Sequence, residues 1–398
     1  MESNVNHYLD RLYEIELALN NNDLNRVSRR LLDLTHDFKC DPQLIENSLL
    51  FREQYNLNKE LGQSGNNNNQ LEEHFLNLIK QLKSCSPEPI TENESEIICL
   101  AKNIEKAYNT FHLQQINLKL ERGKIIGLVG ENGNGKTTLL RLLCGELSSS
   151  GGTIEFFAGN KQLTTWEEIK KEVAFIPQRI NRWWGNVEEQ VSFAAALKGY
   201  KGIKNKEAVR FIIHRLGLTR FKNHSWSELS SGYKLRVEIA KTLVWNPRVL
   251  MLDEPLANLD LLAQELLLQD IKDLAYSAKN PVSVILSSQQ LHEVETIADQ
   301  IVFLKNGRAV FNGAIHELNA QEDYFTLEID GAFSYAELSV LLEDFKVRIE
   351  KNATGFTIYL PKDFNVNDLL SKITNANLEL KYFRNITSST KKLFNDKY

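Results

Sequence analysis

The sequence predicts a mixed α/β protein in three parts: an all-α region with a linker at 1–95, an α/β domain at 96–318 and an α+β domain at 319–398. Apolar residues in the first part recur every three or four positions, as on one face of a helix. Short apolar runs alternate with helical stretches in the second part, which is typical of α/β domains. The third part orders its predicted elements as β-α-β-β-α-β, which is the ferredoxin-like order.

The composition is that of an ordinary water-soluble globular protein, with 42% hydrophobic and 25% charged residues. No apolar run approaches the roughly 20 residues that span a bilayer, and the N-terminus lacks the basic start and apolar core of a signal peptide. Cys40, Cys85, Cys99 and Cys144 form no C-x-x-C pair, which favours reduced thiols in the cytoplasm without zinc. The net charge of −5 provides no general attraction to nucleic acid, so we expect no such partner.

Apolar stripes in the first part predict helices at 8–19, 24–38, 42 onward and 71–82. Asp23 can cap the second helix, and Pro42 after Asp41 is a common helix start. Ser64–Asn69 predicts a flexible loop, and Ser84–Asn93, with two prolines, predicts a linker. The stripes fit either a small helical domain with its own core, which they favour, or a separable docking module for an unknown partner.

In the third part we expect strands at 324–329, 347–350, 356–360 and 378–383, and helices at 334–342 and 366–373. No catalytic constellation is visible there. Its end is mildly basic, with Lys381, Arg384, Lys391, Lys392 and Lys397. A solvated face is the favoured interpretation over contact with an anionic membrane surface.

The stretch Gly130–Thr138 reads G-E-N-G-N-G-K-T-T and matches G-x-x-x-x-G-K-[ST]. An apolar strand pattern precedes it and a leucine-rich helix start follows it, which is the context of a phosphate-binding loop. Backbone N–H groups and the helix N-terminus can then bind phosphates, Lys136 can reach the β- and γ-phosphates of ATP, and the Thr137 hydroxyl can ligate Mg²⁺. The predicted binding residues of the loop are Gly130, Asn132, Gly133, Asn134, Gly135, Lys136, Thr137 and Thr138.

A second apolar strand, Val249–Leu252, ends in Asp253 and Glu254. Ligands of open α/β sheets bind at the carboxyl ends of strands. Asp253 is therefore placed to hold Mg²⁺ beside Thr137, directly or through water, and Glu254 to polarise an attacking water.

Between these motifs, Leu229–Tyr233 reads L-S-S-G-Y and leads into a helical run. In this order the chain closely resembles the ATP-binding cassette (ABC) family, whose signature is usually L-S-G-G-Q. The sequence departs from that signature at Ser231 and Tyr233. It keeps Ser230 and Gly232, which the resemblance implies meet the γ-phosphate.

The resemblance implies roles for three further residues. Tyr108 lies where the family stacks an aromatic ring on adenine, although a core tyrosine at a strand end is the alternative. Gln178, in F-I-P-Q, resembles the glutamine that senses Mg²⁺ and links the ATPase to a transmembrane subunit. Asp260, in N-L-D, resembles the carboxylate of the D-loop.

One position departs more seriously, because the family usually places a histidine where this chain has Gln289. A glutamine amide can donate to the γ-phosphate, but it cannot carry a proton or a positive charge at neutral pH. Slow hydrolysis is therefore expected. His292, three residues later, is interpreted as an ordinary surface residue on the following helix.

The resemblance covers residues 96–318, and the tail is similar to the C-terminal extension of exporter-type ABC ATPases, including a helix start at Thr390–Phe394. It implies an ATP- and Mg²⁺-dependent ATPase that forms a head-to-tail nucleotide sandwich with a second ABC subunit, most simply as a homodimer. It also implies separate transmembrane subunits, and hence a peripheral position on the cytoplasmic face of a membrane. Trp183 and Trp184 beside Arg182 could anchor such a subunit or pack internally. The alternative is a soluble ABC ATPase that remodels a non-membrane partner docked on the N-terminal helices.

Overall fold

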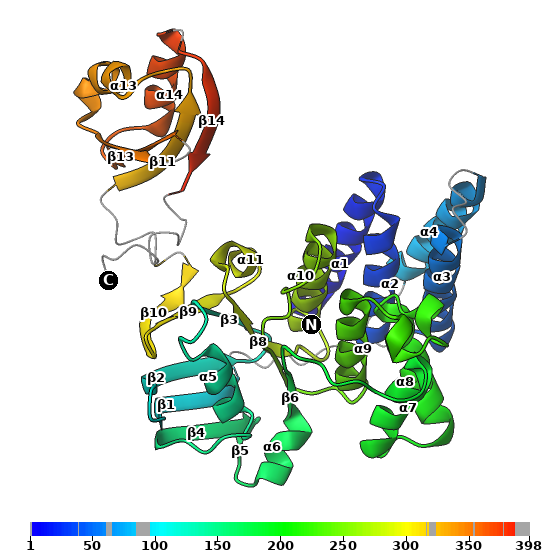
Figure 1. Ribbon diagram of the computed structural model, residues 1–398. Helices are drawn as coiled ribbons and strands as arrows, with labels where there is room; N and C mark the ends of the chain where they lie inside the picture. The colour runs from blue at the N-terminus through cyan, green and yellow to red at the C-terminus, as the bar shows by residue number, and fades with distance from the viewer. Residues whose placement is uncertain are drawn as a thin grey trace.

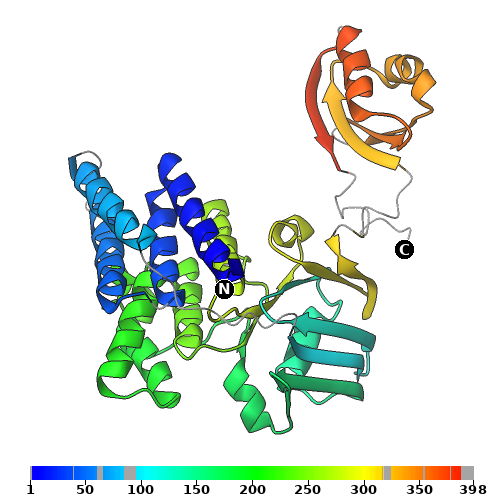
Figure 2. The same ribbon diagram turned by 180° about the vertical axis from the view of Figure 1, so that it is seen from behind.

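The computed structural model describes residues 2–38, 40–60, 66–84, 96–315, 317, 324–352, 355–376 and 378–386. N-terminal helices pack beside a helical region of the middle part, two sheets lie next to that region, and a further sheet lies near the C-terminus (Figures 1 and 2). None of the described helices is both long enough and apolar enough to cross a membrane.

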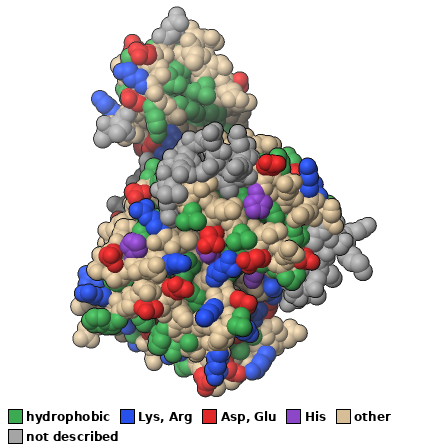
Figure 3. Space-filling view, turned by 90° about the vertical axis from the view of Figure 1, so that its right-hand side faces the viewer, with side chains coloured by type: hydrophobic (Ala, Val, Ile, Leu, Met, Phe, Trp, Pro, Cys, Tyr) green, Lys and Arg blue, Asp and Glu red, His purple; other side chains and the backbone are tan. Residues whose placement is uncertain are grey.

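The N-terminal part consists of α1 (Glu2–Asn20), α2 (Leu24–Asp37), α3 (Pro42–Glu60) and α4 (Asn66–Lys83). Asp23 caps α2 by accepting a hydrogen bond from the Arg26 backbone N–H. The four helices share an apolar core that includes Tyr8, Leu31, Phe51 and Phe75. On the side of the molecule that carries α3 and α8 in Figure 1, acidic and basic side chains are intermixed (Figure 3).

The predicted loop at Ser64–Asn69 is wrong from Asn66 onward, because α4 begins there. Asparagine is a weak helix former, at well under about 1 kcal/mol per residue relative to alanine. The buried side chains of Phe75, Leu78 and Leu82 anchor the helix downstream, so it can extend back through the asparagines. Apart from Ser84, the described residues do not include the predicted linker.

The middle part is built on a six-stranded sheet of order β10-β9-β3-β8-β7-β6. Its strands are β3 (Ile125–Val129), β6 (Val173–Ile176), β7 (Val249–Leu252), β8 (Ser283–Ser288), β9 (Gln300–Lys305) and β10 (Arg308–Ala314). All neighbouring pairs are parallel except β9 with β10. The carboxyl ends of β3 and β7 therefore meet at the same edge, with only β8 between them.

Both faces of this sheet are covered, which explains its unbroken apolar strands. Leu250 and Leu252 of β7 point into one core, and Val249 and Met251 point into the opposite core. The second core also contains α5 (Lys136–Leu143) and an antiparallel sheet of order β2-β1-β4-β5. The strands of that sheet are β1 (Ile97–Ala107), β2 (His112–Glu121), β4 (Gly151–Ala158) and β5 (Lys161–Leu163).

The first core joins the sheet to a helical region and to α10 (Leu261–Ala275). The other helices of the middle part are α6 (Trp166–Glu172), α7 (Val187–Leu197), α8 (Gly202–Arg215), η1 (Thr219–Phe221), η2 (Trp226–Glu228), α9 (Ser231–Leu243) and α11 (Leu291–Glu295). The α8 helix contacts both α2 and α3, so the N-terminal helices lie against this helical region.

The C-terminal part has its own apolar core and an antiparallel sheet of order β12-β13-β11-β14. Its elements are β11 (Tyr324–Gly331), α13 (Tyr335–Leu341), η3 (Glu343–Phe345), β12 (Arg348–Asn352), β13 (Gly355–Pro361), α14 (Val366–Asn375) and β14 (Leu380–Asn385). The helix start predicted at Thr390–Phe394 lies outside the described residues.

Candidate nucleotide site

The glycine-rich loop connects the end of β3 to the start of α5. A Cβ atom on Gly130 would lie 2.4 Å from the Leu304 carbonyl oxygen, and one on Gly135 would lie 2.8 Å from the Phe111 ring. Gly135, the N-cap of α5, also has a φ of 100°, which favours glycine. The loop can therefore take this shape only with glycine at these two positions.

Lys136 is the first residue of α5, and its side chain is buried. Its Nζ donates to the carbonyl oxygens of Gly130 at 2.6 Å and Glu131 at 3.2 Å. It also lies 3.0 Å from Oε1 of Glu254. The ammonium group therefore points back into the loop, where backbone carbonyls and one carboxylate surround it.

Asp253 follows β7 directly and is buried. Its Oδ2 accepts a hydrogen bond from the Thr137 hydroxyl, and its Oδ1 accepts one from the Ser287 hydroxyl, both at 2.8 Å. A hydroxyl oxygen and a carboxylate oxygen are thus adjacent, and such hard donors suit Mg²⁺. These two residues could hold the ion that ATP brings with it.

Glu254 has a φ of 49°, in the left-handed region that few residues other than glycine adopt. Its backbone N–H donates to the Ser287 hydroxyl at 2.8 Å, which helps to hold this conformation. Its Oε2 accepts a hydrogen bond from Nε2 of Gln289 at 3.3 Å. Gln289 therefore lies beside Glu254, which with Asp253 forms the pair of strand-end acids that follow β7. His292 lies exposed on α11.

Gln178, which is exposed, follows β6 at the same edge of the sheet. It lines a cavity of about 190 Å³ together with Asp253, Glu254 and Ser231. The structure thus brings five predicted residues to one edge of the sheet: Lys136, Gln178, Asp253, Glu254 and Gln289.

Ser230 caps α9, and its hydroxyl accepts from the Tyr233 backbone N–H at 3.5 Å. The Ser231 hydroxyl donates to the Asn258 carbonyl oxygen at 3.0 Å, and the Tyr233 ring lies 3.9 Å from the ring of Phe221. The two departures from the usual signature therefore make contacts within this chain. Ser230 itself is exposed.

In Figures 1 and 2, α9 and α5 lie on opposite sides of β6. Gly232 lies beside Leu259, at whose side chain a Cβ atom would come within 3.3 Å. Asp260 is exposed and caps α10 by accepting from the Ala263 backbone N–H at 2.8 Å. Both residues therefore contact the segment 259–263, which leads into α10.

Tyr108 is 45% exposed, so it is not a core residue. The Lys106 ammonium lies 5.6 Å from the centre of its ring. Within the loop, Asn132 is exposed, while Oδ1 of Asn134 accepts from the Asn306 backbone N–H at 2.9 Å. Asn134 thus ties the loop to the turn between β9 and β10.

Two residues of the site were missed from the sequence. The Ser287 hydroxyl contacts both strand-end acids, and the Ser288 carbonyl oxygen accepts from the Gly130 backbone N–H at 3.3 Å. The sequence did contain a signal for these two site residues: they are polar and they end an apolar strand just before Gln289.

A sequence profile of the family described as ABC transporter matches residues 113–257. The chain is 28% identical over 288 residues to the uncharacterized ABC transporter ATP-binding protein YxlF of Bacillus subtilis, covering 71% of this chain and 92% of YxlF. It is 30% identical over 271 residues to the methionine import ATP-binding protein MetN 2 of Bacillus licheniformis, covering 65% of this chain and 78% of MetN 2.

A solved structure of cbiO1 from Clostridium perfringens, described as part of the ABC transporter complex cbiONQ, is similar with a TM-score of 0.50. Its sequence identity is 24%, and the similarity covers 57% of this chain and 96% of that chain. At that identity the likeness shows a shared fold.

Proposed function

This chain belongs to the ABC transporter family of ATP-binding proteins, and from that premise we propose that it is the ATP-hydrolysing subunit of an exporter-like transporter. The family hydrolyses ATP, and the chain is an ATPase. We propose that it works as a head-to-tail dimer with two ATP molecules between the subunits, and that it acts on separate transmembrane subunits at the cytoplasmic face of a membrane.

The observation that carries the dimer is the separation of the two half-sites. Lys136 and Thr137 begin α5, whereas Ser230 and Gly232 belong to the start of α9, a helix on the opposite side of β6 (Figure 1). A second copy that faces the first would supply the missing half-site. ATP would then favour the closed dimer, because only that state offers both halves.

Within each site, Lys136 would hold the β- and γ-phosphates and Tyr108 would stack on adenine. Mg²⁺, held by Thr137, Asp253 and Gln178, would neutralise charge on the phosphates. Glu254 would orient and polarise the attacking water. The loop residues and Asp260 would complete the site as the sequence predicts.

Gln289 would donate a neutral hydrogen bond to the γ-phosphate. Its present contact with Glu254 supports a place beside the attacking water. Because an amide cannot be protonated at neutral pH, the bond lacks charge assistance, and we propose slow turnover for this reason.

Docking on a transmembrane subunit is supported by the aromatic pair after Gln178. Trp183 packs against the core under the Lys241 ammonium, which lies 3.4 Å from the centre of its ring, whereas Trp184 is 84% exposed. Phe193 and Leu197, one turn apart on α7, are also exposed. Exposed aromatic residues of this kind are common anchors at interfaces.

We propose the three predicted domain ranges, 1–95, 96–318 and 319–398, with a ferredoxin-like fold for the last. The separate core of the C-terminal part and the antiparallel order of its four strands support that assignment. The exporter-like direction rests on the resemblance of this tail.

A specific observation favours a second candidate, a soluble ABC ATPase that remodels a non-membrane partner. Leu9, Tyr13 and Leu17 follow each other at one-turn spacing on α1 and are 49%, 66% and 49% exposed. Such an apolar stripe suits a docked protein segment. Recovery of the chain with a polytopic membrane protein from its native cells would favour the transporter instead.

The test of the proposed function is the variant Glu254→Gln, which keeps nucleotide contacts and removes the carboxylate. We expect it to bind ATP, to hydrolyse it about 10²- to 10⁴-fold more slowly, and to form a dimer that needs ATP and Mg²⁺. Light scattering with and without nucleotide measures the dimer. The matched control is Glu254→Gln combined with Lys136→Ala, which should stay monomeric. A Glu254→Gln protein that binds ATP yet stays monomeric, even with its membrane partner, would contradict the sandwich.

A further inference from the structure

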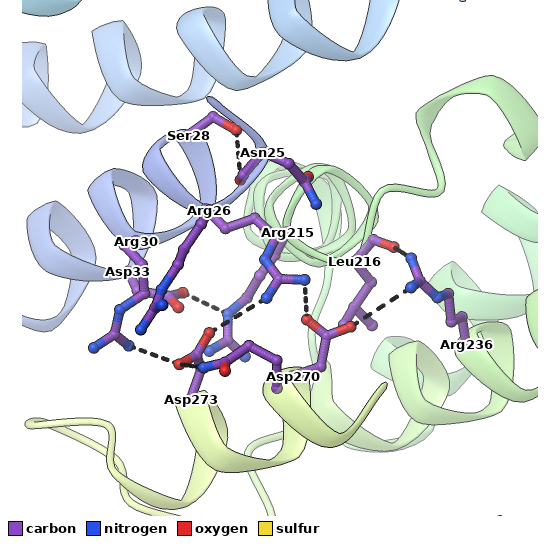
Figure 4. A network of polar contacts seen from close by, with 12 residues as sticks. Asn25, Arg26, Ser28, Arg30, Asp33, Arg215, Leu216, Arg236, Asp270 and Asp273 are labelled. Atoms are coloured by element: carbon purple, nitrogen blue, oxygen red, sulfur yellow. Dashed lines mark hydrogen bonds and ion pairs between the residues drawn. The ribbon is translucent and has the colours of Figure 1, made fainter. Parts of the chain in front are cut away.

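A group of buried charges joins the N-terminal helices to helices of the ATPase (Figure 4), and none of its members is among the nucleotide-site residues described above. We call it the seam. It consists of Arg29, Arg30 and Asp33 of α2, Arg215 of α8, Arg236 of α9, and Asp270 and Asp273 of α10. All of these side chains except Arg215 and Arg236 have an exposed fraction of 11% or less.

Arg29 is the centre of the seam. Its guanidinium forms an ion pair with Asp270, and its Nη2 lies 3.3 Å from Oδ2 of Asp273. Asp273 also lies 3.1 Å from Arg30. Asp270 in turn lies 3.9 Å from Nη2 of Arg236, on the signature helix α9. Through Asp270, a single residue of α2 is therefore connected to both α9 and α10.

The same helix pair, α2 and α3, also holds the end of α8. Nε of Arg215 lies 2.6 Å from Oδ1 of Asp33. Arg52 of α3 donates from Nε to the His214 carbonyl oxygen at 3.2 Å and from Nη1 to the Ser28 hydroxyl at 2.7 Å. The N-terminal helices thus contact α8 and α10 directly and are linked to α9 through Asp270.

Apolar packing between these parts is incomplete, which leaves the charges to set their relative position. A cavity of about 540 Å³ lies between α2 and α3 on one side and α8 on the other, lined by Ile45, Leu49, Phe211 and the Asp33–Arg215 pair among others. Buried ion pairs are often no more stabilising than well-packed apolar residues, but they demand a definite geometry. At this interface the ion pairs therefore suit a role in fixing the relative position of the two parts better than a role in stabilisation alone.

Two of the helices that the seam joins, α9 and α10, are capped by Ser230 and Asp260, which are predicted to bind ATP. Arg236 lies six residues after Ser230, about 9 Å along α9, and Asp270 lies ten residues after Asp260, about 15 Å along α10. A change in the angle between α9 and α10 therefore displaces Ser230 and Gly232 relative to the strand-end acids.

We propose that Arg29 is a positioning residue for ATP hydrolysis: through Asp270 it fixes the signature helix against α10, so that Ser230 and Gly232 meet the nucleotide of the opposite subunit. The proposal rests on the proposed sandwich. It makes the N-terminal helices a working part of the ATPase rather than only a docking module.

The test compares Arg29→Met with Arg29→Lys and with the matched control Arg26→Met, which removes an exposed arginine of the same helix. In Arg29→Met we expect kcat to fall about tenfold or more while KM and the affinity of the isolated subunit for ATP change by less than about twofold. The ATP-dependent dimer of the Glu254→Gln background should weaken by a similar factor. Arg29→Lys should lie between, and Arg26→Met should match the wild type.

A purely structural role predicts a different result. Arg29→Met would then melt at a lower temperature but keep normal kcat and dimer affinity when assayed well below its melting point, and that result would overturn the proposal. If Arg29→Met does not fold, Arg236→Met provides the measurement, because it leaves Asp270 paired with Arg29. Its kcat should fall by about two- to fivefold at unchanged KM, and an unchanged kcat would overturn the proposal.

Failure of the sandwich itself is recognised separately, because the Glu254→Gln protein would then show no ATP-dependent dimer at all. The seam is in that case tested without nucleotide by amide hydrogen exchange. Arg29→Met should speed exchange in the first two turns of α9 relative to Arg26→Met. Equal exchange rates in the two variants would contradict the proposal that Arg29 fixes the position of α9.

Discussion

The nucleotide site and the seam each contain a buried pair of opposite charges, and the two pairs are built differently. Lys136 and Glu254 have exposed side-chain fractions of 5% and 9%, and Arg29 and Asp270 have 6% and 9%. The other partners of Lys136 are two backbone carbonyls of its own loop. Arg29 instead joins two carboxylates of a helix more than 200 residues away in the chain.

The comparison teaches that burial of a pair does not by itself reveal its role. A lysine held by its own loop, beside a carboxylate that lines a cavity, is suited to exchange those partners for phosphate oxygens. No ligand is proposed to replace the partners of the charges that are paired across helices. A substitution that removes one of these charges therefore leaves its partner buried and unpaired. We therefore expect changes at the site to affect activity and changes in the seam to affect stability and geometry.

The largest expected effect is that of Lys136→Ala. It removes contacts to two phosphates, each worth about 1.5–3 kcal/mol when charge-assisted, so ATP affinity should fall about 10²- to 10⁴-fold. The free energy of unfolding should change by less than in the seam variants. Titration calorimetry and urea unfolding measure the two quantities. A folded variant with normal affinity would remove Lys136 from the phosphate site.

The next largest effect is that of Asp33→Asn in the seam. It removes the carboxylate that is paired with the buried Arg215 guanidinium, leaving only the charge of Asp37 near it on α2, and should cost about 3–5 kcal/mol of stability. Affinity of the isolated subunit for ATP should stay within about twofold. The control is Glu46→Gln, which disrupts the exposed pair between Arg210 and Glu46 and should cost at most about 1 kcal/mol. Equal losses of stability in the two variants would mean that the buried ion pair of the seam contributes no more than the exposed pair on the surface.

The difference between the two regions also explains what the sequence could predict. Phosphate binding needs particular residues at fixed spacing, so Gly130–Thr138 and the acids after β7 could be predicted as site residues without a structure. Gln289 could be predicted because its neighbours fall in the order of the family. Ser287 was missed, since a serine at a strand end is common and its two contacts depend on how β7 and β8 pair.

The seam could not have been predicted in this way. Arg29 and Asp270 lie on helices whose apolar stripes predict the fold, yet each would pass as an ordinary surface charge in the sequence. Their pairing depends on how α2 packs against α10, which local patterns do not encode. For the same reason the sequence left a separable docking module open as the alternative to a helical domain with its own core. The ion pairs of Arg29 and Asp33 with α10 and α8 are contacts that such a module would have to break.

A smaller effect, within the site, is expected for Gln289→His. The imidazolium can form a charge-assisted bond that the amide cannot, worth about 1.5–3 kcal/mol in the transition state, or about 10- to 100-fold in rate. Turnover should rise more than ATP affinity changes, and Gln289→Ala should lower turnover further. Single-turnover kinetics shows whether chemistry limits the rate. No gain in the histidine variant under that condition would mean that Gln289 does not act at the γ-phosphate.

The smallest effect concerns Asp37, at the end of α2 near the seam. Its Oδ2 accepts from the Ser277 hydroxyl at 2.8 Å and from the Ala278 backbone N–H at 3.0 Å, which ties the helix to the turn after α10. Burial alone would raise the pKa of this carboxyl. The nearby His36 ring, the hydrogen bond from Ser277 and the charge of Arg215 outweigh burial and hold the pKa below its ordinary value.

Since the pKa is lower in the folded state, the charged carboxylate stabilises the fold. Its contribution is fully present above the unfolded pKa of about 3.9 and is lost as the pH falls through the lower folded value. The variant Asp37→Asn keeps an acceptor but no charge, and should be less stable by about 1 kcal/mol at pH 6. Urea unfolding between pH 6 and 3 should show this gap constant down to about pH 5 and closing below about pH 4, because only the wild type loses the charge. If the difference in stability between the two proteins instead widened as the pH falls, burial rather than the hydrogen-bonding and charged partners would control the pKa of Asp37. The contact of Asp37 with the turn after α10 would then weaken the seam.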